Sequence, residues 1–148
     1  MCILKKPPTT TMQRIKGLMS GTLPTFIDVG GNFNSYIIEE DNLLKQFNIN
    51  NRSIVFMGDD TWATLFEEKV FEKMYPYPSF NVKDIDTVDR NVNEKLMEIL
   101  NEKIKIKWSL LIAHYLGIDH VGHTFGSKHP IMKRKLGEID STIEYSNF

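Results

Sequence analysis

The sequence predicts an α/β fold in which a mainly parallel sheet is flanked by helices. Apolar, β-branched segments of strand length alternate along the chain with amphipathic segments of helical period, and this alternation is typical of parallel sheets. Polar residues gather directly after the strand segments, where such sheets place their binding sites. No internal repeat, Gly/Ser-rich linker or low-complexity block divides the 148 residues, which suits a single domain.

The first half of the chain is predicted to hold three helices and one strand. A short helix is expected over residues 12–18, and a second over 35–47, where apolar residues recur with helical spacing. The run SIVFMGD, residues 53–59, is predicted as a buried strand because it is apolar, β-branched and ends in Gly-Asp. A third helix is expected over residues 61–74, with Thr61 as a candidate N-cap.

The second half is predicted to hold two helices and one strand. Residues 92–104 have the pattern of an amphipathic helix, and residues 108–117 that of a strand running into a histidine-rich segment. A last helix is expected over residues 130–145, because Pro130 suits the first position of a helix.

The composition excludes several classes of protein and of site. The net charge of −1 indicates no general attraction to nucleic acid, which we do not expect as a partner. No apolar run approaches the roughly 18 residues that span a bilayer, and the first residues do not have the pattern of a signal peptide. Cys2 is the only cysteine, so any metal bound by this chain needs His and carboxylate ligands.

The segment HYLGIDHVGHTFG, residues 114–126, holds three of the four histidines. Asp119 and His123 are four residues apart, so on a helical turn both project from one face, and a carboxylate with an imidazole suits Zn²⁺, Mn²⁺ or Fe²⁺. The alternative is a polar loop without a metal, since two ligands are fewer than a zinc site normally takes from protein. We expect His114 to be packed within the strand and His129 to be exposed before the last helix.

Two further stretches contain groups that can stabilise a phosphate. Thr9, Thr10 and Thr11 precede a predicted helix, and a hydroxyl at a helix N-terminus lies beside unpaired N–H groups and the positive end of the helix dipole. The alternative for these threonines is ordinary N-capping. Asn32 follows two glycines in a predicted turn and has an amide that can donate to an oxyanion; its alternative is a plain turn.

Taken in order, the segments PPTTTMQR, VFMGDDTW and LLIAHYLGIDHVGHTFG resemble the lumenal catalytic region of the glycosylphosphatidylinositol (GPI) ethanolamine phosphate transferases, with the type 3 members the nearest. The resemblance covers nearly all of residues 7–143. These enzymes belong to the alkaline phosphatase superfamily, so the resemblance implies part of an alkaline-phosphatase-like sandwich.

The resemblance implies roles for individual residues. The family's P-T-x-T segment matches residues 8–11 and selects Thr11 as the nucleophile. Its amide that contacts the phosphoryl oxygen falls on Asn32, and its D-x-x-x-H metal pair falls on Asp119 and His123. The family's site holds two divalent metal ions, expected to be zinc.

Under this resemblance, three further polar residues are expected to lie beside the metal ligands or the substrate. Asp59, Asp60 and His120 are expected to support the ligands or to face the substrate. For Asp59 and Asp60 the alternative is that they end the strand and cap the helix beginning at Thr61.

The resemblance also implies a reaction, partners and a location. Phosphoethanolamine is expected to pass from phosphatidylethanolamine to a mannose, the third, of the GPI precursor through a phosphothreonine-type intermediate. The expected location is the endoplasmic reticulum membrane with the catalytic region in the lumen, and a small membrane subunit is an expected stabilising partner. The triplet Asn51-Arg52-Ser53 matches the N-glycosylation pattern and fits a lumenal surface turn, although such triplets also occur by chance.

Two superfamily features do not occur in this sequence. These are an Asp that ends a first strand before the Pro-Thr segment and a later D-H-G motif, both of which supply metal ligands. We therefore expect residues 1–148 to be a partial lumenal catalytic domain with both flanks missing, poorly soluble and inactive alone. The alternatives are a truncated, non-catalytic product and a free-standing metal-binding module.

Overall fold

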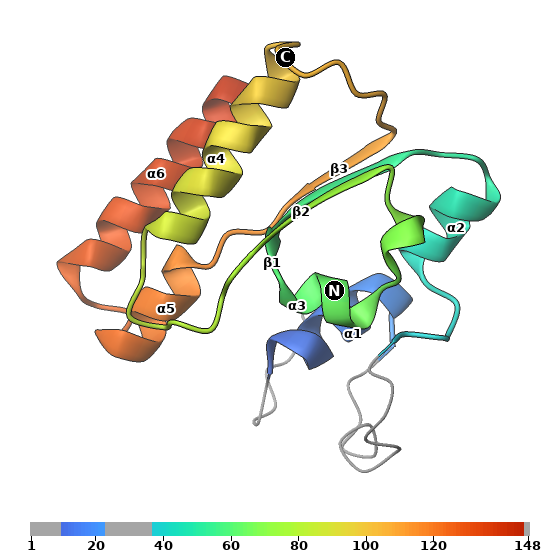
Figure 1. The fold of residues 1–148 in the computed structure, drawn as a ribbon. Coiled ribbons are helices and arrows are strands. Elements are labelled where there is room, and N and C mark those ends of the chain that lie inside the picture. The colour runs from blue at the N-terminus through green and yellow to red at the C-terminus, as the bar shows by residue number, and fades with distance from the viewer. Residues whose placement is uncertain (1–9, 23–36, 147–148) are drawn as a thin grey trace.

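The computed structural model describes residues 10–22 and 37–146, and its centre is a three-stranded parallel sheet (Figure 1). The strands are β1 (Ile54–Asp59), β2 (Lys73–Tyr77) and β3 (Leu110–Ala113), arranged in the order β2-β1-β3. Both neighbours of β1 run parallel to it. The predicted α/β class with a parallel sheet and flanking helices is confirmed.

Strand β1 is the core of the fold, and all six of its residues are buried. Because side chains alternate along a strand, Ile54 and Phe56 pack into one cluster while Val55 and Met57 pack into another. A parallel strand covered on both faces is expected to be apolar, as residues 54–57 are, and the strand then ends in Gly58 and the buried Asp59.

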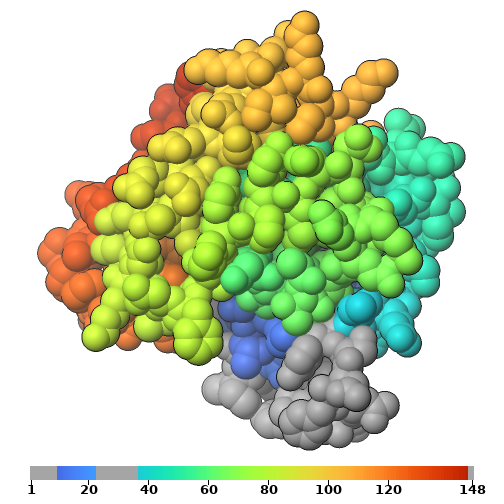
Figure 2. Space-filling model, in the orientation of Figure 1, coloured from blue at the N-terminus to red at the C-terminus, as the bar shows by residue number. Residues whose placement is uncertain are grey.

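Helices cover both faces of the sheet. The helices are α1 (Thr11–Ser20), α2 (Leu43–Ile49), α3 (Thr61–Leu65), α4 (Thr87–Leu100), α5 (Gly117–Thr124) and α6 (Pro130–Ser146). Helices α1, α2 and α3 contribute to the cluster around Phe56, and α4 contributes to the cluster around Val55. Accordingly α4 (yellow) and α2 (turquoise) lie on opposite sides of the molecule (Figure 1, Figure 2).

Four predicted elements agree with the structure apart from their ends. The helix expected over 12–18 is α1, and the strand expected over 53–59 is β1. The helix expected over 92–104 is α4, which starts five residues earlier and ends four earlier. The helix expected over 130–145 is α6, which does begin at Pro130.

The helix predicted over 35–47 is wrong in its first part. Within the described residues the helix starts only at Leu43, because Asn42 caps it by accepting a hydrogen bond from the Lys45 N–H at 3.0 Å. Residues 37–42 are not helical, and the Ile38 N–H donates instead to the carbonyl of Leu65 at the end of α3.

The helix predicted over 61–74 is wrong in its second part. Helix α3 ends at Leu65, because Phe66 adopts an extended conformation that turns its ring into the core. A 3₁₀ turn (Glu68–Val70) follows, and then the chain forms β2, which we did not predict. Pairing with β1 decides the conformation of this segment over its helical pattern, and Pro76 is tolerated since β2 is an outer strand of the described sheet.

The strand predicted over 108–117 is shorter than expected. Strand β3 ends at Ala113, and α5 already begins at Gly117. Among the described residues, no helix combines the length and the apolar character needed to cross a membrane.

We predict that Phe56→Ala lowers the free energy of unfolding by about 3–5 kcal/mol, because the ring is fully buried and contacts Trp62 and Phe71. Chemical denaturation of the chain measures this loss. Phe80→Ala is the matched control, since Phe80 is 99% exposed. Equal losses for the two variants would contradict the assignment of Phe56 to the core.

Candidate functional site

The candidate site lies at the edge of the sheet where the strands end. Asp59 aligns with Tyr77 across the β1–β2 pair, and Met57 aligns with Ala113 across the β1–β3 pair. Helices α3 and α5 begin just beyond this edge, and α1 packs against α3 (Figure 1). Parallel α/β sheets place ligands at this edge.

Asp119 and His123 project from one face of α5. The carboxylate Oδ2 of Asp119 lies 3.4 Å from Nε2 of His123, and both side chains are more than 60% exposed. The helical turn that the D-x-x-x-H spacing requires is therefore present. An exposed carboxylate and imidazole at this distance suit a divalent metal ion that enters between them.

The two residues do not form a complete metal site by themselves. Within residues 10–22 and 37–146, no group of three or more His, Cys, Asp or Glu side chains is gathered around one point. Further ligands for an ion held by Asp119 and His123 have to come from outside this set.

The start of α1 distinguishes the neighbouring threonines. Thr10 is the N-cap: its hydroxyl accepts from the Gln13 N–H at 3.5 Å, and its carbonyl accepts from Arg14. Thr11 is the first helical residue and is half-buried. The capping role that the sequence allowed for these threonines falls on Thr10, whereas Asn32 lies outside the described residues.

Asp59 and Asp60 both bond to the protein itself. Asp59 is buried at the end of β1 and accepts the Thr61 N–H at 2.8 Å, so it ends the strand and caps the next helix. Asp60 accepts hydrogen bonds from the N–H and the hydroxyl of Ser79, which fastens the loop after β2 to the start of α3. The alternative considered for these two residues holds for Asp59, which bonds to the first N–H of α3. Asp60 occupies the N-cap position, but its side chain makes no cap hydrogen bond, and Thr61, the expected N-cap, is instead the first helical residue.

The remaining histidines have separate partners. His120 is buried, and its Nδ1 lies 2.8 Å from the carbonyl of Asp84, which ties α5 to the segment before α4. His129 is half-buried rather than exposed as expected: its Nδ1 accepts the Ile131 N–H, and its ring stacks on Phe125.

His114 is packed, as expected, but directly after β3 rather than within it. Its Nδ1 accepts the indole N–H of Trp62 at 3.0 Å. Burial lowers the pKa of His114, which outweighs the opposite effect of the nearby carboxylates, Asp59 first among them. The neutral imidazole matches the hydrogen bond, since a protonated Nδ1 could not accept one.

A buried ion pair, which the sequence did not predict, holds the start of α5. Both backbone N–H groups of Leu116 and Gly117 donate to Oδ1 of Asp89 in α4, at 2.8 and 2.9 Å. The other oxygen of Asp89 lies 2.9 Å from Nζ of Lys135 in α6, a side chain that is 2% exposed. Three helices thus meet at one carboxylate, just before the turn that carries Asp119.

The surroundings of this ion pair favour the charged form of Lys135 and leave no free space beside the pair. Burial by itself lowers the pKa of Lys135, but hydrogen bonds to Glu138, Asp89 and Asp86 raise it above the usual value. A Cβ atom at Gly117 would lie 2.2 Å from both the Asp89 carboxylate and the Lys135 side chain, so this position requires glycine. No sequence pattern indicates this contact, because its members lie 28 and 46 positions apart.

Comparison with known proteins identifies the family. The family model for type I phosphodiesterase / nucleotide pyrophosphatase matches residues 33–145. The chain belongs to this family. Proteins of the family generally depend on metal ions.

The most similar relatives include several GPI ethanolamine phosphate transferases, which confirms the resemblance. The catalytic subunit of GPI ethanolamine phosphate transferase 3 from Homo sapiens is 52% identical over 138 residues, 93% of this chain and 12% of the relative. The type 3 transferase from Saccharomyces cerevisiae is 47% identical over 94% of this chain and 14% of its own length. The type 2 catalytic subunit from Homo sapiens is 45% identical over 93% of this chain and 14% of its own length.

The chain spans about an eighth of the length of these curated relatives. No solved structure matches it significantly.

We predict that the burial of His114 makes the free energy of unfolding depend on pH. The pKa of His114 is lower in the folded chain than the ordinary value of 6.5, so the unfolded chain binds this proton more readily. The contribution of His114 is complete above about pH 6.5 and is lost as the pH falls from there toward the folded-state pKa. Denaturation midpoints across this range measure the effect, and His114→Gln should flatten the slope; an unchanged slope would contradict the assignment.

We predict that Asp89→Asn lowers the free energy of unfolding by about 2–3 kcal/mol, because it leaves the buried Lys135 with less compensation. Hydrogen exchange of the Leu116 and Gly117 amides should also accelerate relative to the amides of β1. Glu94→Gln, an exposed change on the same helix, is the control. Slow exchange at both amides in the Asp89 variant would show that Asp89 does not hold α5.

Proposed function

We propose that this chain is the central part of the catalytic domain of a GPI ethanolamine phosphate transferase that modifies the third mannose of the GPI precursor. The observation that carries the proposal is the similarity over almost the whole chain, which is higher to the human type 3 catalytic subunit, at 52%, than to the human type 2 catalytic subunit, at 45%.

The geometry at the edge of the sheet supports Thr11 as the nucleophile. The N-cap bond is made by Thr10, so the Thr11 hydroxyl has no capping role. The backbone N–H groups of Thr11 and Met12 have no acceptor within the helix, since a helix leaves its first N–H groups unpaired. These donors and the helix dipole favour negative charge on a phosphoryl group at this end of α1.

The proposed reaction proceeds in two displacements. The Thr11 oxygen forms a bond to the phosphorus of phosphatidylethanolamine, the bond from phosphorus to the glycerol oxygen breaks, and diacylglycerol leaves with the proton. The 6-hydroxyl of the mannose then attacks the same phosphorus, gives up its proton and releases the Thr11 hydroxyl. Asn32 is the proposed contact to a phosphoryl oxygen during both displacements.

Asp119 and His123 are the proposed ligands of one divalent ion, and their exposed, adjacent side chains fit this role. Two ions, zinc in our proposal, would activate the attacking hydroxyl and stabilise charge on the phosphoryl oxygens. Asp59 supports the site by binding the first N–H of α3. His120 supports it by bonding to the carbonyl of Asp84, in the segment before α4. The proposed location is the lumenal side of the endoplasmic reticulum membrane, with a small membrane subunit as a stabilising partner.

A second candidate function is a non-catalytic product of the same family. It is favoured by the limited ligand set, because Asp119 and His123 are two ligands and no group of three or more His, Cys, Asp or Glu side chains is gathered among the described residues. A chimera distinguishes the transferase from the non-catalytic product. In this chimera, our chain replaces the aligned segment of the human type 3 subunit, and it is expressed in cells that lack that subunit. Restored transfer of labelled phosphoethanolamine to the GPI precursor is expected; a chimera made in normal amount without transfer would favour the second candidate.

We predict that Thr11→Ala in the active chimera lowers transfer at least about 1000-fold, because the nucleophile is lost. Thr10→Ala is the matched control: it removes the N-cap, worth about 1 kcal/mol of stability, and leaves the Thr11 hydroxyl in place, so transfer should fall only a few-fold. Retained transfer in the Thr11 variant together with loss in the Thr10 variant would show that the wrong threonine was assigned.

A further inference from the structure

The turn between α2 and β1 carries a feature that the proposed reaction does not use. Asn51-Arg52-Ser53 is the only triplet in the 148 residues with the pattern Asn-x-Ser/Thr. The Asn51 N–H donates to the carbonyl of Asn48, and the Arg52 N–H donates to the carbonyl of Phe47, both at 2.9 Å. The chain therefore turns sharply at Asn51, which has a positive φ of 54° and is exposed.

We propose that Asn51 is an acceptor of an N-linked glycan. The proposal rests on the proposed function in one respect, because it requires this part of the chain to face the lumen. The chemical partner is an oligosaccharide joined to a lipid through a pyrophosphate. The Asn51 amide nitrogen forms a bond to the anomeric carbon of the first sugar, the bond from that carbon to the pyrophosphate breaks, and the amide proton leaves with the lipid pyrophosphate.

The position of the turn suits a bulky group. Asn51 and the residues on either side of it, Asn50 and Arg52, are all exposed. Ser53, the other residue of the triplet, is half-buried and leads into β1, and its carbonyl accepts the Ser109 N–H at 2.8 Å. The glycan would thus be attached at the exposed end of the turn, while Ser53 is fixed by its hydrogen bond to Ser109.

The turn is also far from the candidate site. It precedes the first residue of β1, whereas the candidate site follows the last, and the six residues of the strand separate the two edges by about 20 Å. A glycan at Asn51 would leave Thr11, Asp119 and their substrate accessible.

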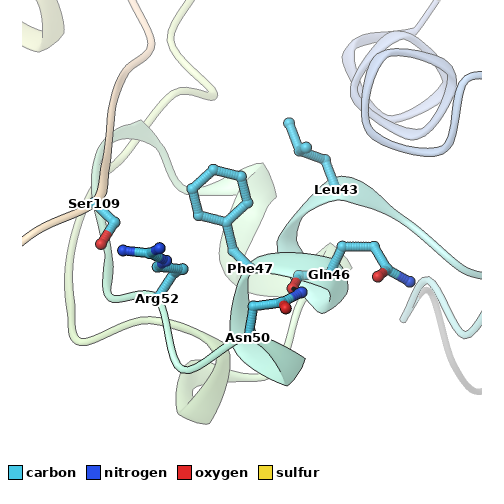
Figure 3. Close-up of a pocket in the computed structure, with 6 residues that line it drawn as sticks. All are labelled: Leu43, Gln46, Phe47, Asn50, Arg52 and Ser109. Carbon is cyan, nitrogen blue, oxygen red and sulfur yellow. Dashed lines mark hydrogen bonds between the residues drawn. The ribbon is translucent and has the colours of Figure 1, made fainter.

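A cavity of about 440 Å³ lies beside the turn, and a glycan on Asn51 would cover it. It is lined by Leu43, Gln46, Phe47, Asn50, Arg52 and Ser109, so both neighbours of Asn51 line it. Figure 3 shows the Phe47 ring between the side chains of Leu43 and Arg52. Leu43 at 44%, Ile49 at 63% and Trp108 at 44% are exposed around this region, and apolar surface of this kind promotes association unless it is covered.

The test is site-specific detection of the modification in the chimera. Enzymatic removal of N-glycans converts a modified asparagine to aspartate, and mass spectrometry of the peptide that contains Asn51 detects the change. We expect conversion in the parent chimera and in Ser53→Thr, and none in Ser53→Ala. Asn51→Gln should retain transfer within about two-fold while aggregating more readily, because the apolar region loses its cover.

A control placed in the same chain separates this proposal from the proposed function. Lys103→Thr completes a second triplet beginning at Asn101, which is exposed in the turn after α4. Modification of Asn101 without modification of Asn51 would overturn the proposal and leave the lumenal placement intact. Modification of neither would overturn the proposal and contradict the lumenal placement as well.

Discussion

The parallel pairing of β1 with β2 and β3 determines where the helices of this fold lie. It buries β1 on both faces, so its residues are apolar until the strand ends at Gly58-Asp59. It also brings the ends of all three strands to one edge, from which α3 and α5 depart. Helix α5, which carries Asp119 and His123, and helix α1, which begins at Thr11, lie toward the same end of the molecule (Figure 1), although more than 100 residues separate Thr11 from Asp119 in sequence.

The buried ion pair of Asp89 and Lys135 fixes the orientation of α5. A short helix such as α5 has little apolar surface with which to fix its own orientation, and of its residues only Gly117, His120 and Val121 are buried. The Asp89 carboxylate binds its first N–H groups, and Lys135 binds Asp89, so the helix is fixed by directional bonds. Removing one member of such a pair is strongly destabilising, whereas the pair as a whole adds little stability over an apolar replacement. The Asp89–Lys135 pair therefore determines the position of α5 more than it adds to the stability of the fold.

The elements that the sequence predicted well are those with one dominant local signal. The apolar run of β1, the N-terminal proline of α6 and the helical period of α4 each decide their own conformation. Residues 61–74 were assigned wrongly beyond Leu65 because the helical pattern there is overridden by pairing with β1, which is a contact between distant residues. The i, i+4 geometry of Asp119 and His123 followed from spacing alone, whereas the contact of Asp89 with Lys135 and Gly117 is set by packing and leaves no local pattern.

The proposed function requires Asp119 and His123 to hold a metal ion beside the Thr11 hydroxyl. The most direct measurement is anomalous X-ray scattering at the zinc edge from crystals of the active chimera. We expect a zinc peak about 2.0–2.2 Å from an oxygen of Asp119 and from a nitrogen of His123. Zinc peaks that leave both of these side chains without a metal contact would contradict it.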